Sequence, residues 1–149
     1  MSDADDLKNA IARYDDGINS RFGPLEAATR LLQIDVDVFF AMVYGWLRGI
    51  PSISLLRVPA QITLELAGSP VQFDTHDLLL RFAHQEVLIS PQGNQADSVF
   101  FALQGLPGGP RRIARDQRKQ CWEVYLLGTL ESELDADYLL KKLLLLVPR

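Results

Sequence analysis

The chain has 149 residues, of which 48% are hydrophobic and 23% charged, and its formal net charge is -4. This length is typical of one domain, so we expect a single domain over residues 1–149. The negative charge argues against a general nucleic-acid coat and against attachment to anionic lipid by charge alone. A lone cysteine, Cys121, excludes an intramolecular disulfide framework. The acidic start MSDADD is not typical of a signal peptide, and we therefore expect a cytoplasmic protein.

Residues 1–50 have a helical pattern. Four apolar residues recur at spacings of four, three and four, which predicts one stripe of an amphipathic helix: Leu7, Ile11, Tyr14 and Ile18. Gly23 and Pro24 interrupt this helix, and Pro24 suits the first turn of a second one. We expect the second helix to turn four residues inward: Leu25, Ala28, Leu31 and Leu32.

The most apolar stretch runs over residues 33–47. Its uninterrupted apolar part lies between Asp37 and Arg48 and is too short to span a membrane, which needs roughly 20 residues. Residues 33–40 alternate as a strand would, but residues 41–47 lose that alternation, and we favour a helix starting near Asp35. A helix that is hydrophobic almost all round must be buried on most sides.

Residues 25–49 resemble helix-turn-helix DNA-binding modules in general, with the turn at 33–37. A recognition helix presents polar and basic side chains to bases and phosphates. The second helix here would instead present aromatic residues such as Phe39, Tyr44 and Trp46. The pattern therefore indicates a helix for packing or dimerisation.

Residues 60–130 are mainly β in pattern, after breaks at Gly49, Pro51 and Pro59. Residues 78–82 and 87–89 predict a hairpin, and the alternative is a helix that Thr75 caps. The fold class we expect is α+β, with N-terminal helices, an antiparallel meander sheet of about five or six strands and a C-terminal helix at 133–147 packed on the sheet. The remaining strands are expected at residues 61–66, 71–73, 98–103 and 121–130, with a polar loop at 91–97.

A basic segment follows the glycine-rich residues 105–110. It carries five cations: Arg111, Arg112, Arg115, Arg118 and Lys119. As a helix or loop at 108–120 it would gather positive charge, and arginine suits phosphate and carboxylate, so an anionic ligand or acidic partner is one hypothesis. The other is a solvated helix face that the acidic N-terminus neutralises. The sequence GLPGGP lacks the lysine and hydroxyl residue of a phosphate-binding loop.

Weaker candidates for chemistry lie elsewhere. Residues Asp74, His76, Asp77 and His84 could hold a divalent metal, but no metal-ligand spacing accompanies them, and we favour a turn over residues 73–77 that Asp74 and Thr75 cap. Asp35 and Asp37 form a DxD pair that in a helix would cap and charge the first turn. We expect Cys121 to be buried in a strand. We therefore assign no catalytic residue, metal or cofactor.

The leading functional expectation is a non-catalytic protein that binds another protein, or a second copy of itself, through apolar helix surface. We expect an adaptor, chaperone-like or inhibitor-like subunit rather than an enzyme, without insertion into a membrane. Its small acidic α+β composition, ending in a strand and a helix, resembles class I type III secretion chaperones. The alternatives are a regulator that binds nucleic acid or a phosphate-bearing ligand through Arg111–Lys119, and a small metal enzyme using Asp74, His76 and His84. The partner-binding residues we expect are Phe39, Phe40, Tyr44 and Trp46.

Overall fold

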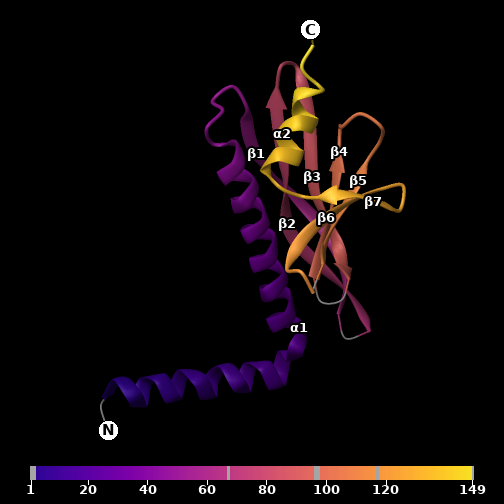
Figure 1. Cartoon of the computed structure of the whole chain (residues 1–149). Helices are drawn as coiled ribbons and strands as arrows, with labels where there is room; N and C mark the ends of the chain where they lie inside the picture. The colour runs from indigo at the N-terminus through magenta and orange to yellow at the C-terminus, as the bar shows by residue number, and fades with distance from the viewer. Residues whose placement is uncertain (1–2, 67, 96–97, 117, 149) are drawn as a thin grey trace.

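The computed structural model describes residues 3–66, 68–95, 98–116 and 118–148, and the side chains of residues 12–28 lie outside that description. Within these residues the chain forms a long helix, a seven-stranded antiparallel sheet and a short second helix (Figure 1). The strands pair in sequence order, so the sheet is a simple meander, as expected. The elements are α1 (Asp3–Leu47), β1 (Ser54–Leu66), β2 (Ser69–Phe82), β3 (Gln85–Gln95), β4 (Ser98–Gln104), β5 (Arg111–Asp116), β6 (Cys121–Leu126), β7 (Thr129–Glu133) and α2 (Ala136–Leu144).

The sheet has more strands than the five or six expected. The strands expected at 71–73 and 78–82 are one strand, β2, but residues 111–116 add the unexpected strand β5, and the single strand expected at 121–130 is a hairpin. Leu127 and Gly128 connect β6 to β7 with φ angles of 53° and 81°. A two-residue turn with positive φ at both positions matches the twist of paired strands. The hairpin expected around residues 83–86 is confirmed, and its turn residues Ala83 and His84 also have positive φ.

Two strands run through residues that predicted a break. Pro59 lies inside β1, where it pairs opposite His76. The strand order places β1 at the edge of the sheet, and proline is tolerated there because it removes no interior ladder hydrogen bond. In β3, the expected polar loop is strand as far as Gln95, with a register shift between Pro91 and Gly93.

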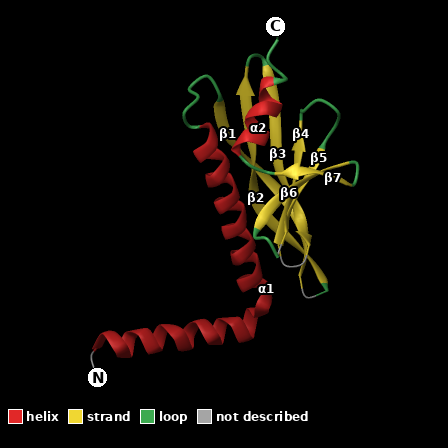
Figure 2. Ribbon diagram, in the orientation of Figure 1, coloured by secondary structure: helices red, strands yellow, loops and turns green. Residues whose placement is uncertain are grey.

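The helical part is one helix over Asp3–Leu47, and the expectation of several N-terminal helices is wrong. Gly23 and Pro24 lie within this helix. A proline inside a helix can kink the helix without ending it. Figure 2 shows the result as two limbs, of which the second lies along the sheet and the first points away from it. Residues 35–47 are helical as expected, but no helix starts near Asp35, because α1 continues through this position, and the turn at 33–37 and the helix-turn-helix arrangement are therefore wrong.

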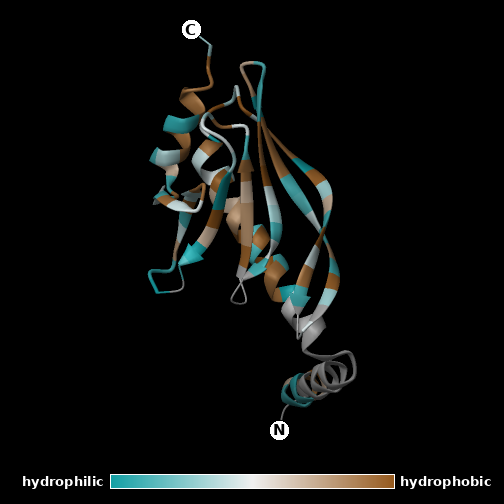
Figure 3. Cartoon of the chain, turned by 90° about the vertical axis from the view of Figure 1, so that its right-hand side faces the viewer, coloured by the Kyte–Doolittle hydropathy of each residue, from teal (hydrophilic) through white to brown (hydrophobic). Residues whose placement is uncertain are grey.

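The core lies between the second limb of α1, α2 and one face of the sheet. Phe39 stacks on Phe101 of β4 at 4.0 Å between ring centroids and meets Trp122 of β6 edge-on at 4.8 Å. The α2 helix covers the same face with Leu139 and Leu143, so the C-terminal helix packs on the sheet as expected (Figure 3). It is shorter than the predicted 133–147. The buried stripe of α1 is Leu32, Val36, Phe39, Phe40, Val43 and Leu47.

Candidate functional site

The side of α1 that faces away from the sheet carries large apolar side chains. Leu31, Ile34 and Val38 are 64%, 50% and 61% exposed. Ala41 and Gly45, which are also exposed, continue the same spacing of three and four residues. We call these five residues the outer stripe. Such a surface on a folded protein usually marks a contact with another molecule.

The outer stripe lies opposite the buried stripe because successive residues of a helix turn by about 100°. The expectation that this helix is buried on most sides holds only in part: the buried stripe and the half-buried residues beside it, among them Tyr44 and Trp46, are covered, whereas the outer stripe is not. Leu31, expected to point inward, is exposed, whereas Leu32 is buried as expected. The inward positions expected for Leu25 and Ala28 fall among the side chains that the structure does not describe.

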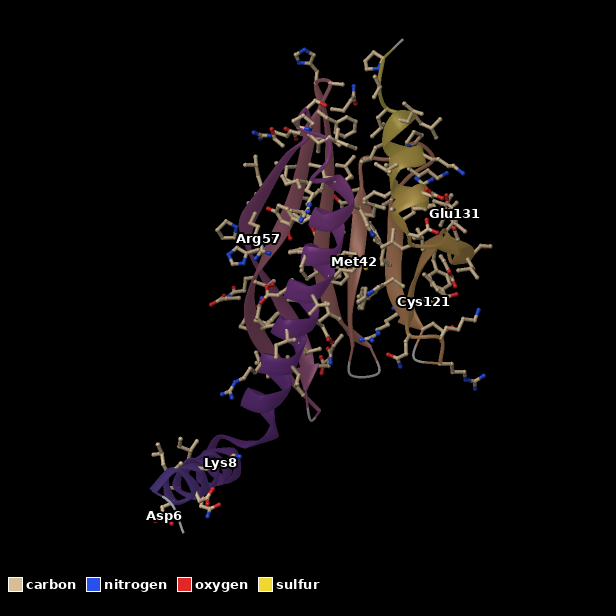
Figure 4. The ribbon with its side chains drawn as sticks, turned by 60° about the vertical axis from the view of Figure 1, so that its left-hand side comes forward. Asp6, Lys8, Met42, Arg57, Cys121 and Glu131 are labelled. Carbon is tan, nitrogen blue, oxygen red and sulfur yellow. The ribbon has the colours of Figure 1, made fainter. Side chains whose placement is uncertain are left out.

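Charged and polar contacts border the outer stripe on the side of β1. The guanidinium of Arg57 lies 5.8 Å from the ring centroids of both Phe40 and Tyr44, and 3.8 Å from the Asp37 carboxylate. The Tyr44 hydroxyl also donates to the carbonyl of Leu55 at 3.5 Å. These contacts fix the helix against the edge strand (Figure 4).

On the opposite side of α1, Asp35 is half-buried and faces β5. Burial raises the pKa of its carboxyl group, and the charge of Arg115 partly offsets that effect. Asp35 and Asp37 therefore point to different sides of the helix and hold no shared ligand. Neither caps a first turn, as was expected, because α1 begins at Asp3.

Of the residues expected to bind a partner, Phe39 and Phe40 are fully buried, and Tyr44 and Trp46 are half-buried against the core. The folded protein therefore offers neither phenylalanine ring to another molecule. The apolar surface left for a partner is the outer stripe. Its spacing is visible in the sequence, but two apolar stripes share this helix and local pattern does not tell which one meets the sheet.

The basic segment is strand β5 and a turn, and its expected helical alignment is wrong. Arg111 is buried on the face that α2 covers, where it donates to Glu131 at 3.1 Å and to the carbonyls of Pro107 and Gly109. Glu131 also accepts from Lys142 of α2 at 3.0 Å. Arg111 therefore joins β5, β7 and α2, and it is not accessible to an anion.

The charge network alters the acidity of its members. Burial acts to raise the pKa of Glu131, but hydrogen bonds from Arg111 and Lys142 outweigh it, and the pKa is lowered. Burial, with the negative charge of Glu131, raises the pKa of the nearby Tyr138 to about 12. Glu131 is thus held as a carboxylate and Tyr138 as a neutral phenol.

The other four cations lie in separate places. Arg112 points to the opposite face of the sheet, with its guanidinium 4.3 Å from the Phe100 ring centroid. Arg115 donates to the side chain of Gln120 at 2.6 Å. Arg118 and Lys119 lie in the β5–β6 turn, where their backbone N–H groups donate to Asp116. Side chains alternate along a strand, so the five cations do not form one patch.

The residues considered for metal binding are likewise apart. Asp74 and His76 lie in β2, not in the expected turn, and Asp74 accepts a hydrogen bond from Gln61 at 2.8 Å. His84 lies in the β2–β3 turn beside a hollow of about 440 Å³ that this one hairpin forms. Among the described residues, no three His, Cys, Asp or Glu side chains come close enough to hold a metal.

Cys121 is half-buried in β6, and its Sγ donates to Glu133 at 3.6 Å. Burial, together with Glu133, raises the pKa of the thiol. This suppresses the thiolate that a nucleophile requires. In the described part of the chain, neither helix combines the length and apolarity needed to cross a membrane.

Comparison with protein-family models, with curated proteins and with solved structures finds no match to this chain.

Proposed function

We propose that this is a non-catalytic interaction protein, an adaptor, chaperone-like or inhibitor-like subunit that binds another protein chain through the outer stripe of α1. One observation carries the proposal: Leu31, Ile34 and Val38 are each at least half exposed on a helix whose opposite side is packed in the core. A helix that presents apolar residues at such spacing is a common form of protein recognition.

Covering this surface would offset part of the cost of association, which is at least about 4 kcal/mol. Burial of a fully exposed aliphatic side chain contributes about 1.5–3 kcal/mol. Leu31, Ile34 and Val38 are 64%, 50% and 61% exposed, so each would contribute half or a little more of that gain. The rigid packing of α1 on the sheet lowers the cost of association, because the helix is already formed before a partner arrives.

Photo-cross-linking in cells of the source organism tests the proposal. A photoreactive phenylalanine analogue at Val38 is expected to give protein adducts, because this position lies in the centre of the outer stripe. The same analogue at Gln72, an exposed residue of β2, is the matched control and is expected to give none. Absence of any adduct at Val38 beyond the Gln72 background would contradict the proposal.

A further inference from the structure

We propose that the partner of the outer stripe is a second copy of this chain, with the two α1 helices side by side and parallel. This inference rests on the proposed function and names the occupant of the surface. It follows from the spacing of the stripe, from the charges beside it and from the position of the sheet.

The spacing is that of a coiled-coil seam. Leu31, Ile34, Val38, Ala41 and Gly45 follow one another at intervals of three, four, three and four residues, which are the a and d positions of a heptad. Over this length α1 is about 22 Å long. A Cβ atom added at Gly45 would meet nothing within 4 Å, so the space beside the stripe is open to another helix.

The small residues at one end of the seam favour close approach. Ala41 and Gly45 let two helix backbones come near each other, while Leu31, Ile34 and Val38 supply the larger contacts. A parallel pair places identical residues of the two helices in the same layer, so the ends with Ala41 and Gly45 lie next to each other. The size of the side chains in the seam then decreases steadily from Leu31 to Gly45.

The charges that flank the stripe favour the parallel arrangement. Arg30 and Asp35 occupy g and e positions, and a g residue in one helix faces the e residue five positions later in its parallel partner. Each Arg30 would therefore face Asp35 of the other copy, twice by symmetry. An antiparallel pair that overlaps the same stripe would instead bring the two Asp37 side chains near each other.

The sheet does not obstruct this pairing. It lies on the side of α1 opposite the outer stripe, and of the described elements only the first limb of α1 itself extends to the outward side, at the N-terminal end below the stripe (Figures 1 and 4). A two-fold axis parallel to α1 would place the two sheets on the outside of the pair. Each helix would then be packed between its own sheet and the helix of its partner.

The size of the contact sets the expected affinity. Two helices in contact over about 22 Å form an interface at the small end of the range, below about 1,200 Å². We therefore expect a dimer that forms in the micromolar range and dissociates on dilution. Its mass would rise from the 16.7 kDa of one chain toward twice that value.

Sedimentation measured over a range of concentrations tests this inference with matched variants. Val38→Glu introduces facing carboxylates into the seam and should weaken association at least tenfold, whereas Val147→Glu, at an exposed valine of the C-terminal segment, should not change it. Circular dichroism verifies that each variant remains folded. A dimer that Val38→Glu does not weaken would overturn the inference.

Charge reversal tests the parallel direction. Arg30→Glu should weaken the dimer through repulsion from Asp35 of the other copy, and the double variant Arg30→Glu, Asp35→Arg should restore it. Because Asp35 also lies near Arg115 of its own chain, circular dichroism must show that the double variant remains folded. Failure of the folded double variant to restore association, with Arg30→Glu weakened, would overturn the parallel pairing. Association is restored only if the two residues face each other across the seam. If either substitution acted by disturbing the fold, combining the two would not restore association.

Two further outcomes separate this inference from the proposed function. Purified protein that stays monomeric up to about 0.5 mM would overturn the dimer, and adducts from Val38 with a different protein would then leave the proposed function standing. Absence of both dimer and adduct would overturn both.

Discussion

Arg111 is the buried member of the basic segment, and its contacts are all internal. Its guanidinium satisfies Glu131 and two backbone carbonyls between β5, β7 and α2. Arg112, its neighbour, is exposed on the other face of the sheet and stacks on Phe100. Two adjacent arginines therefore differ in role because strand geometry sends them to opposite faces.

We predict that Arg111→Met destabilises the protein by about 3 kcal/mol, because it leaves Glu131 with Lys142 alone and removes the donor of the Pro107 and Gly109 carbonyls. Arg112→Met, the matched control, should cost less than about 1 kcal/mol, since the side chain of Arg112 is exposed and its contacts lie at the surface. Urea unfolding followed by circular dichroism measures both. Equal losses for the two variants would contradict the structural role given to Arg111.

At the scale of elements, the β6–β7 hairpin illustrates how a turn is decided by two residues. Leu127 is 88% exposed and adopts a φ of 53°, a conformation that costs a side chain such as leucine roughly 1 kcal/mol. Gly128, at 81°, adopts its positive φ without that cost. The hairpin thus keeps an unfavourable residue at one turn position and a favourable one at the other.

Leu127→Asn should therefore stabilise the protein by about 0.5–1 kcal/mol, because asparagine tolerates positive φ and suits this turn. Gly128→Ala should destabilise it by about 1 kcal/mol for the opposite reason. Thermal unfolding of both variants, followed by circular dichroism, gives the comparison. A lower midpoint for Leu127→Asn than for the unmodified protein would disprove this account of the turn.

At the scale of the whole molecule, α1 extends well beyond the sheet that it covers. Figure 1 shows its first limb pointing away from the body of the protein, and Leu7 and Ile11 on this limb are 62% and 53% exposed. Leu7 and Ile11, the two residues of the expected stripe whose side chains the structure describes, are therefore not buried. Tyr14 and Ile18 lie outside the described side chains.

Removal of residues 1–11 should consequently shift the thermal midpoint by less than about 2 °C, since residues 4–11 are all exposed. It should also leave self-association unchanged, because the outer stripe begins at Leu31. Calorimetry of the shortened and full chains measures the first effect, and sedimentation the second. A fall of many degrees would show that this limb stabilises the body.

Local pattern determined much of this fold from the sequence. Alternation with a period of two predicted the meander and the hairpin around residues 83–86, and the apolar run at 33–47 predicted a helix. Turn chemistry was harder to recognise, because Leu127 is not a residue that usually predicts a turn. The strand at residues 111–116 was missed because its arginines fit helical spacing as well as they fit strand alternation.

What the tertiary structure alone decided was burial. Leu31 and Leu32 are adjacent leucines of one helix, yet one is exposed and the other is in the core. Residue type and spacing predict that a helix carries apolar stripes, but the sheet, formed by residues distant in sequence, selects the stripe that packs. Arg111 is buried for the same reason: Glu131, which also pairs with Lys142, reaches it only after β5, β7 and α2 have come together.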